Sequence, residues 1–423
     1  MKYSYPVHPH IPAAQRLDRQ LRIDGWNQRA LEQTVVGVVG DEELTVSLFL
    51  LSAAALGLNR LKVLTPRVDA TLVDIAGKLN PELRLTLLEG YYTHPVIGEL
   101  FADCRVVVDF SAYALAAKLI LQQAYQENRA VVRGSFLAEN HFQGLQVFTY
   151  FRGREWQELE QMLPSANLPA PRTHDSVLSI ILTGLALEEA KNLLMGRPVS
   201  PHIIAYRRKE LPPARQDLAI LVVGAGALGN FVGLGLAFSG FTRITFMDGD
   251  VVEPTNLNRQ ILFYDAVGQS KAETLAARLN HHWRTQARGV VGYFQEHTDV
   301  SPYDLIIDCV DNFESRIVLS HQAKKHSKML VSGGAGVSAG QVVAYDPSQD
   351  GPTPAELLGL PDIVSRRTPG SYQRERAACV YQPDPAVIMT NQIVGGLMVD
   401  ACRQLAAGIS PPNLFYENPV IST

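Results

Sequence analysis

Residues 221–271, LVVGAGALGNFVGLGLAFSGFTRITFMDGDVVEPTNLNRQILFYDAVGQSK, contain the pattern that decides the fold. An apolar strand leads into a glycine turn, a helix follows, and a second strand ends at Asp248. Gly224, Gly226 and Gly229 let the backbone turn tightly and approach a phosphate at a helix N-terminus, where unpaired N–H groups favour negative charge. Asp248 lies where a carboxylate can bond ribose hydroxyls. The stretch therefore predicts a nucleotide site in an α/β fold.

Polar side chains suited to phosphate follow the second strand. Asn256, Arg259 and Gln260 form an NxxRQ motif, and Lys271 comes shortly after it. A dinucleotide dehydrogenase needs neither the arginine nor the lysine, whereas a triphosphate calls for both. We therefore expect ATP rather than NAD, and we assign Asp250 to the same site.

A third segment, DLIIDCVDNFESR at 304–316, is predicted to be a buried strand that delivers Asp308, Asp311 and Asn312 to its carboxyl end. Ligands bind at that end of the strands in open α/β sheets. A carboxylate beside a triphosphate is repulsive unless a hard cation lies between them, so Asp311 implies Mg²⁺.

In this order, the glycine loop, ribose carboxylate, NxxRQ, lysine and DxxDN resemble the ubiquitin-activating family, which includes the thiamine- and molybdopterin-pathway adenylyltransferases. The resemblance covers about 217–410. It implies ATP- and Mg²⁺-dependent adenylation of the C-terminal carboxylate of a small ubiquitin-like or sulfur-carrier protein. A downstream conjugating or sulfurtransferase protein is a further expected partner. The resemblance assigns Asp248 to the ribose, Asn256, Arg259, Gln260 and Lys271 to the phosphates, and Asp311 to the metal.

The first half of the chain repeats the second in outline. Residues 34–66 run strand, turn, helix, strand, but Asp41, Glu42 and Glu43 follow the glycine turn. Three carboxylates at a helix N-terminus would repel phosphate. The second strand ends at Thr65 with no ribose carboxylate. We expect this half to hold no nucleotide.

The repeat predicts two Rossmann-like, doubly wound α/β adenylation-type domains that form an internal pseudo-dimer. We expect an inactive domain at 1–197, a linker at 198–216 and an active domain at 217–423. The linker is inferred from its proline-rich, polar composition without periodicity. The tail after 410 is either a last edge strand or a partner contact.

The segment RLDRQLRIDGWNQRALEQ, residues 16–33, resembles the [YL]-[DN]-R-Q segment of the activating family. In that family the arginine crosses the subunit interface and touches the partner's ATP. The resemblance therefore implies that Arg19 of the inactive half reaches the active site of the second half. The alternative is an exposed amphipathic helix with a solvated arginine.

Cys379 lies in a polar segment, 347–380, which corresponds to the crossover loop of the family. The surrounding sequence resembles the compact, noncanonical autophagy-type activating enzymes, and this implies that Cys379 takes the acyl group as a thioester. Arg374 and Arg376 would lower the pKa of the thiol and raise its thiolate content. The alternative is an unused cysteine, as in some relatives.

Composition excludes several classes. A net charge of −4 suggests neither a nucleic-acid surface nor a polybasic membrane patch. Four cysteines without a CxxC pair argue against zinc and disulfides, and the N-terminus has no signal-peptide pattern. We expect a cytoplasmic protein. Two rival functions stay open: adenylation of a peptide or tRNA without a thioester, and, more distantly, a NAD-binding oxidoreductase or nucleotide-sensing module.

Overall fold

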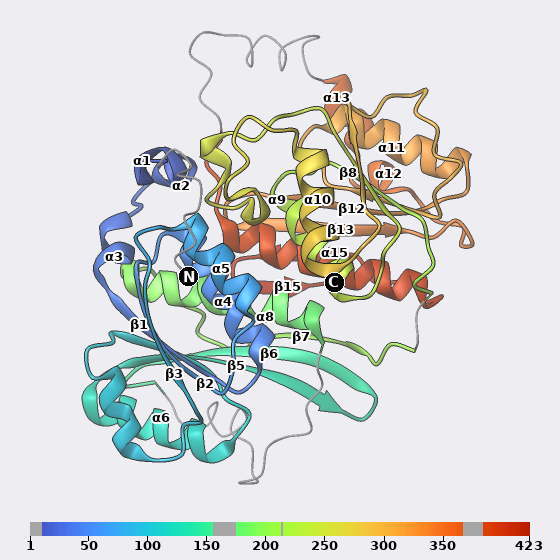
Figure 1. Ribbon diagram of the computed structural model, residues 1–423. Helices are drawn as coiled ribbons and strands as arrows, with labels where there is room; N and C mark the ends of the chain where they lie inside the picture. The colour runs from blue at the N-terminus through green and yellow to red at the C-terminus, as the bar shows by residue number, and fades with distance from the viewer. Residues whose placement is uncertain (1–10, 155–174, 213–214, 367–383) are drawn as a thin grey trace.

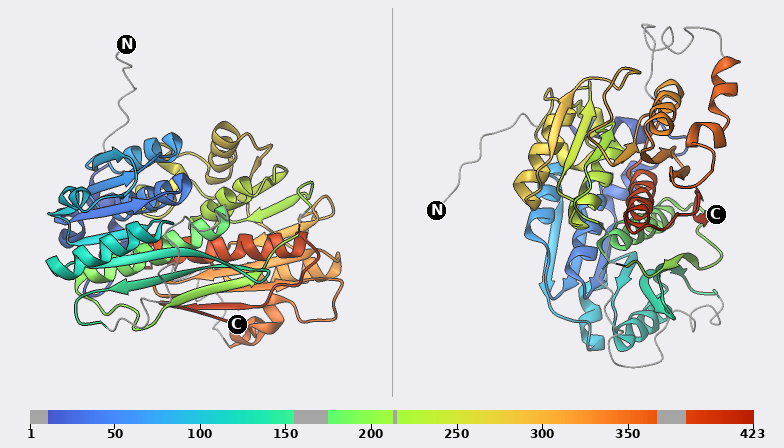
Figure 2. Two further views of the ribbon diagram at one scale, coloured as in Figure 1. Left: turned by 90° about the horizontal axis from the view of Figure 1, so that it is seen from below. Right: turned by 90° about the vertical axis from the view of Figure 1, so that its right-hand side faces the viewer.

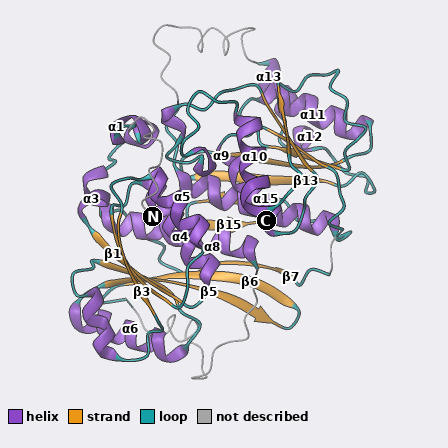
Figure 3. Cartoon of the chain, in the orientation of Figure 1, coloured by secondary structure: helices purple, strands orange, loops and turns teal. Residues whose placement is uncertain are grey.

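Two mixed, mainly parallel sheets with helices between and around them make up the fold (Figure 1). The computed structural model describes residues 11–154, 175–212, 215–366 and 384–423. Figure 3 shows α4, α8, α9 and α15 between the two sheets, with α6 and α11 on their outer sides. This arrangement confirms the predicted pair of doubly wound α/β domains.

The first sheet contains strands β1 to β7. Their bounds are β1 Val35–Gly40, β2 Arg60–Thr65, β3 Arg84–Glu89, β4 Val106–Phe110, β5 Ala130–Glu139, β6 Phe142–Tyr150 and β7 Ile204–Lys209. The helices of this half are α1 Ala13–Arg16, α2 Asp18–Leu21, α3 Gln28–Gln33, α4 Glu43–Leu56, α5 Ala70–Leu79, η1 Pro95–Phe101, α6 Ala114–Glu127 and α8 Ser176–Met195.

The second sheet contains strands β8 to β15. Their bounds are β8 Ile220–Val223, β9 Ile244–Asp248, β10 Arg288–Val291, β11 Leu305–Asp308, β12 Met329–Ala335, β13 Ala339–Tyr345, β14 Leu414–Glu417 and β15 Val420–Ser422. The helices are α9 Ala227–Phe238, η2 Pro254–Asn256, η3 Ile261–Phe263, α10 Lys271–Trp283, α11 Phe313–Lys325, α12 Pro354–Leu357, α13 Leu360–Ser365 and α15 Ile388–Ala406.

The two sheets share one topology. The first has the order β3-β2-β1-β4-β5-β6-β7, and the second has β10-β9-β8-β11-β12-β13-β14-β15. In the first half Val39 pairs with Leu64 and Asp109, and in the second Val223 pairs with Met247 and Asp308. Leu64 is thus equivalent to Met247. Thr65, the residue after Leu64, is therefore equivalent to Asp248, the residue after Met247.

The halves meet through helices that are apolar on all sides. Helix α15 packs against both α8 and α9, and both views in Figure 2 show the red α15 beside the green helices. A helix with apolar residues around its whole circumference is stable only when it is buried. At the centre of the seam, Gln392 Nε2 donates to Ile180 O over 3.0 Å and to Thr183 Oγ1 over 2.7 Å.

The segment 198–216 differs from the predicted irregular linker, because it contains β7. The side chains of Ile204, Tyr206 and Arg208 are buried and alternate with exposed ones, which is the period of a strand. The alternation was not recognised in the sequence, because a charged residue such as Arg208 is expected to face solvent and is buried here. The C-terminal tail forms β14 and β15, so the edge-strand alternative holds for it.

The predicted crossover loop is partly helical, because α12 and α13 lie within its first part. Cys379 and its neighbours lie outside the described residues. Among the residues that are described, none of the helices has the length and apolar character needed to cross a membrane.

Candidate nucleotide site

The glycine turn joins β8 to α9 at the carboxyl edge of the second sheet. β8 lies between β9 and β11, where the strand order reverses, and ligands of open α/β sheets bind at such a point. Gly224 has φ +96°, and a Cβ there would meet Cys309 O at 2.7 Å. A Cβ at Gly229 would collide with Gly224 O. Both positions therefore require glycine.

Gly226 differs from the other two glycines. A Cβ built on it would meet only Gln260 Nε2, at 3.9 Å, so its outer side faces open space. It is the N-cap of α9, and no side chain caps that helix. Backbone N–H groups at an uncapped helix N-terminus, with space in front of them, form an anion site.

Asp248 supports the glycine turn from the neighbouring strand. Its Oδ2 accepts from Ala225 N over 2.7 Å and its Oδ1 accepts from Asp250 N over 2.8 Å. Burial raises the pKa of Asp248, while these backbone donors and the charge of Lys271 act in the opposite direction. The carboxylate thus lies beside the turn, as a ribose ligand would require.

The NxxRQ motif folds against this turn through η2 and η3. Asn256 Oδ1 accepts from Glu253 N, which fixes the start of η2. Arg259 is 7 % exposed and donates from Nη1 to two neutral oxygens, Thr255 O at 2.9 Å and Asn258 Oδ1 at 2.8 Å. Gln260 is 4 % exposed, and its Oε1 has no hydrogen-bond partner among the described residues. The motif therefore presents one unsatisfied polar atom, Gln260 Oε1, near the glycine loop.

Arg19 reaches this motif from the other half of the chain. Burial and then the positive charge of Arg19 lower the pKa of Arg259 to about 9, against a weaker opposite effect of Glu253. Arg19 Nε donates to Asp384 O over 2.6 Å, and Arg19 O accepts from Ala386 N. The charges of two arginines from opposite halves thus influence each other, and a phosphate bound between them would offset this repulsion.

Lys271 and Asp250 form the rim of the site. Lys271 begins α10, and its Nζ donates to Asp250 Oδ2 over 2.9 Å. Asp250 Oδ1 also accepts from Tyr293 OH over 2.8 Å. The ammonium group is therefore held at the edge of the site by a carboxylate that was predicted to bind the nucleotide itself.

The segment after β11 lies beside the glycine turn, because β11 pairs with β8. Asp308 is buried, accepts from Ser332 Oγ and lies 3.6 Å from Arg316 Nη1. Asp311 is exposed, and Asn312 caps α11 by accepting from Ser315 N over 2.8 Å. Asp308 is thus structural, whereas Asp311 is accessible.

The side chains around the glycine turn are compatible with the binding of ATP together with Mg²⁺. No group of three or more potential metal ligands occurs in the described part of the chain. Mg²⁺ is commonly held by one or two carboxylates together with substrate phosphates and water. Asp311 would supply one such oxygen ligand, and the ion would then bind together with the nucleotide.

The matching turn of the first half is closed by its own side chains. Glu42 caps α4 by accepting from Leu44 N and Thr45 N, and Asp41 Oδ2 accepts from Ala112 N over 2.6 Å. A carboxylate of the protein therefore occupies the helix N-terminus that stays open in the second half. This arrangement supports a single nucleotide site in the described structure.

Several supporting residues were not predicted from the sequence. Asn230 Nδ2 donates to Ala225 O and Gly226 O while its Oδ1 accepts from Leu262 N, so it ties the glycine turn to η3. Arg316 donates to Val310 O and Gly333 O. The available signal was a polar residue inside an apolar helix or strand segment, which must find a partner when buried.

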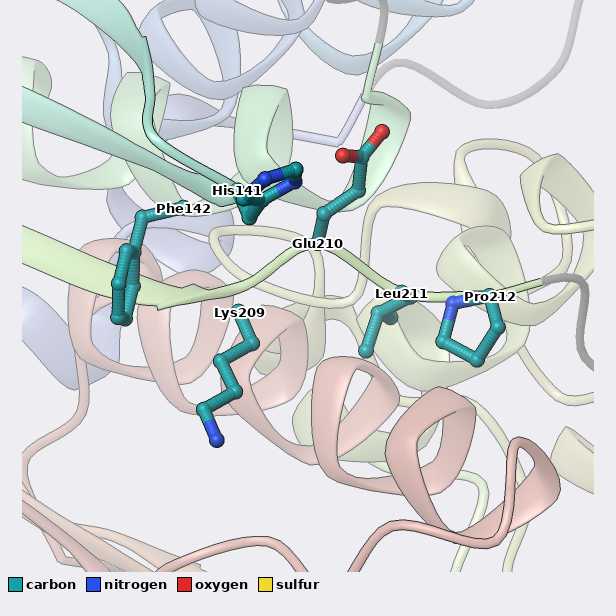
Figure 4. Close-up of a pocket in the computed structure, with 6 residues that line it drawn as sticks. All are labelled: His141, Phe142, Lys209, Glu210, Leu211 and Pro212. Atoms are coloured by element: carbon teal, nitrogen blue, oxygen red, sulfur yellow. The ribbon is translucent and has the colours of Figure 1, made fainter.

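A separate hollow of about 510 Å³ lies at the ends of β6 and β7 (Figure 4). It is lined by His141, Phe142, Lys209, Glu210, Leu211 and Pro212. In Figure 4 the side chains of Lys209 and Glu210 point to opposite sides of the strand. None of the residues predicted for the nucleotide site lines it.

Comparison with known proteins supports the assignment of the second half. Residues 213–419 match the ThiF family, and the C-terminal half of the chain is therefore a ThiF family domain. This confirms the family predicted from the motifs over that half.

Curated relatives carry the name adenylyltransferase and sulfurtransferase. MOCS3-1 of Zea mays is 36 % identical over 205 residues, which cover 46 % of this chain and 40 % of the relative. The uba4 protein of Emericella nidulans is 33 % identical over 189 residues, covering 43 % and 36 %. The chain thus spans about two fifths of the length of these relatives.

Among solved structures, E. coli MccB with ATP aligns with a TM-score of 0.40 at 18 % identity, covering 49 % of this chain and 63 % of MccB. An alignment with this identity and TM-score supports no statement about the function of this protein.

Proposed function

We propose that the chain adenylates the C-terminal carboxylate of a small ubiquitin-like or sulfur-carrier protein, with ATP and Mg²⁺ as co-reactants. The observation that carries the proposal is the hydrogen bond from Asn258 to Gln20, which joins the segments of Arg259 and Arg19 beside an open glycine turn. The names of the curated relatives and the ThiF family match support it.

The reaction joins two anions, so charge is its main obstacle. A carboxylate oxygen attacks the α-phosphorus, the bond to the bridging oxygen breaks, and pyrophosphate leaves with the electron pair. Arg19 and Arg259 would supply fixed positive charge to the phosphates, and Gln260 a neutral polar group for orientation. When bound, Mg²⁺ neutralises phosphate charge, with Asp311 as its protein ligand.

A second step on Cys379 forms part of the proposal. The thiolate would attack the acyl carbon of the adenylate, forming a thioester and releasing AMP. The acyl group would then pass to a conjugating or sulfurtransferase protein. Three described cysteines are free thiols, which agrees with the reducing, cytoplasmic setting that we propose.

Calorimetric titration with ATP·Mg²⁺, and separately with NAD, tests the nucleotide site. We expect one ATP per chain and no NAD binding. Arg19→Ala and Lys271→Ala should each weaken ATP binding by roughly tenfold or more, since a hydrogen bond to a charged group contributes about 1.5–3 kcal/mol.

Arg22→Ala is the matched control for Arg19→Ala. Arg22 follows on the same segment and bonds Asp18 at 3.0 Å, so its loss should leave the ATP affinity unchanged. NAD binding without ATP binding would overturn the proposal.

The acceptor is tested by pyrophosphate exchange with a panel of purified ubiquitin-like and sulfur-carrier proteins. Exchange should require a free C-terminal carboxylate and vanish when that carboxylate is amidated. Arg19→Ala should slow it by about 10²–10³, the effect of removing one donor to a developing oxyanion.

Cys379→Ala separates the two steps, because it should keep exchange but lose the thiol-sensitive covalent carrier adduct. Full transfer activity in that variant would favour adenylation without a thioester.

A further inference from the structure

A hollow of about 410 Å³ opens at the seam between the halves. Trp26, Glu188, Glu189, Lys191, Ser338 and Asn418 are among its lining residues. The first four come from the N-terminal half and the last two from the C-terminal half, so the hollow exists only because the halves pack together.

Strand register identifies the equivalent place on the other side of the seam. Leu145 pairs with both Phe136 and Tyr206, and Gly340 pairs with both Ala335 and Tyr416. Since the two sheets share one strand order, Leu145 and Gly340 occupy equivalent positions in them. Their partners Tyr206 and Tyr416 are therefore counterparts. Two residues further along, Asn418 is the counterpart of Arg208.

The helices give the same correspondence. Glu188 on α8 bonds Asn418 of the C-terminal half, and Asp400 on α15 bonds Arg208 of the N-terminal half. Each acid also has a cation three residues later on its own helix, Lys191 for Glu188 and Arg403 for Asp400. Glu188 and Asp400 therefore take equivalent places at the seam, whereas the counterpart of Asp175, the cap of α8, is the apolar Val387.

The cluster around Asp400 is complete. Arg208 Nε donates to Asp400 Oδ1 over 2.8 Å, and its Nη2 donates to Asp175. Arg403 Nη1 donates to Asp175 Oδ1 over 2.8 Å, and Tyr206 OH donates to Asp400 Oδ2. Two guanidinium groups face two carboxylates, and the guanidinium of Arg208 fills the space between them.

The cluster around Glu188 is incomplete. Glu188 accepts from Lys191 Nζ over 2.7 Å, while Glu189 accepts from Thr149 and from Ser200 N. Lys191 is the cation that bonds Glu188, and Arg197 also lines the hollow. Burial raises the pKa of Glu189, while Thr149, Ser200 N and the charge of Arg154 act in the opposite direction.

Two buried oxygens lie at this end of the seam. Asn418 Oδ1 and Tyr416 OH are buried, and neither has a hydrogen-bond partner among the described residues. Asn418 is shorter than its counterpart Arg208, so the volume that a guanidinium fills on one side of the seam is open on the other. A buried unpaired acceptor costs stability until a donor reaches it.

We propose that this hollow binds a guanidinium group. Its fork of N–H donors would satisfy Asn418 Oδ1 and place a cation beside Glu188, as Arg208 does beside Asp400. The ring of Trp26 forms one wall, and Arg197 lies 5.9 Å from its centroid while donating to Asp24 O. The site requires no nucleotide and is independent of the adenylation proposal.

The guanidinium has two sources, an arginine side chain of a protein or a small guanidine compound. Calorimetric titration of the full chain without ATP, with N-acetyl-arginine N-methylamide and with agmatine, distinguishes them. Binding of the amide alone assigns the site to a polypeptide, and equal binding of agmatine assigns it to a small molecule. N-acetyl-citrulline N-methylamide, the uncharged isostere, should bind at least about tenfold more weakly.

Asn418→Arg provides the decisive variant. Its own guanidinium should fill the hollow as Arg208 fills the other cluster, so binding of the arginine amide should be lost while the protein stays folded. Glu417→Arg is the matched control, because Glu417 is exposed on the same strand and the variant adds a cation outside the hollow.

Asn418→Ala covers the case in which Asn418→Arg fails to fold, and it should weaken binding by removing the acceptor. Equal affinity for the arginine and citrulline amides would overturn the proposal, as would arginine-amide binding that persists in Asn418→Arg.

Discussion

Asn258 Nδ2 donates to Gln20 Oε1 over 3.2 Å and to Ala386 O over 3.1 Å. Gln20 directly follows Arg19, and Asn258 directly precedes Arg259. The side-chain amide of Asn258 therefore connects the segment that contains Arg259 with two others. One is the segment that contains Arg19, and the other is Ala386, which follows the segment that contains Cys379. Asn258 Oδ1 also accepts from Arg259 Nη1, so we predict that Asn258 and Gln20 position the two arginines.

A double-mutant cycle tests this positioning role. Gln20→Ala and Asn258→Ala should each weaken ATP binding, and the double variant should lose less than the sum. The coupling should fall within about 0.5–3 kcal/mol, as found for residues in one hydrogen-bond network. Calorimetry with ATP·Mg²⁺ gives the four affinities.

Asn27→Ala is the control for that cycle. Asn27 caps α3 in the same N-terminal segment by accepting from Ala30 N. Its loss should cost about 1 kcal/mol of stability without changing the ATP affinity. Strictly additive effects of Gln20→Ala and Asn258→Ala on ATP binding would show that the pair does not position the site.

The glycine turn offers a matched pair of substitutions. Gly229→Ala should destabilise the fold, because its Cβ would collide with the backbone of Gly224. Gly226→Ala has open space and should leave the thermal midpoint nearly unchanged, yet weaken ATP binding by placing a methyl group against the phosphates. Thermal unfolding and ATP titration of both variants separate the effects. Unchanged ATP affinity in Gly226→Ala would place the nucleotide elsewhere.

The sequence predicted the second half better than the first. The glycine turn, Asp248 and the NxxRQ motif could be recognised without a structure, because one nucleotide would have to reach all of them and this restricts their spacing. The strand β7 was missed, since its buried Arg208 pairs with Asp400 across the seam. Pairings between residues far apart in the chain depend on packing, and local pattern does not reveal them.

Asp311 gives a prediction about the metal. Asp311→Ala should remove the increase in ATP affinity that Mg²⁺ produces, because we propose this exposed carboxylate as the protein ligand of the ion. Titration of ATP with Mg²⁺ and with a chelator measures this increase. Glu314→Ala, an exposed acid on the next helix, should keep it. Equal Mg²⁺ dependence in both variants would assign the metal to phosphates and water alone.

The complete charge cluster at the seam predicts an acid-sensitive contribution to stability. Burial alone would raise the pKa of Asp175, but Arg403 and Arg208 outweigh it and lower that pKa below the ordinary 3.8. A carboxylate with a lowered folded-state pKa stabilises the fold above its unfolded pKa and loses that effect as the pH falls through the folded value. The seam should therefore weaken below about pH 4.

Asp175→Asn isolates this charge, because asparagine can still accept from Val177 N and Leu178 N and so keep the cap of α8. It should cost about 3–5 kcal/mol at neutral pH, the usual result of leaving one partner of a buried ion pair uncompensated. Urea midpoints between pH 7 and pH 3 should fall less steeply for this variant than for the natural chain. Asp69→Asn, which alters the cap of α5 and leaves the Asp175 cluster intact, should leave the slope unchanged. Parallel slopes for Asp175→Asn and the natural chain would mean that the two halves are not held together by this cluster.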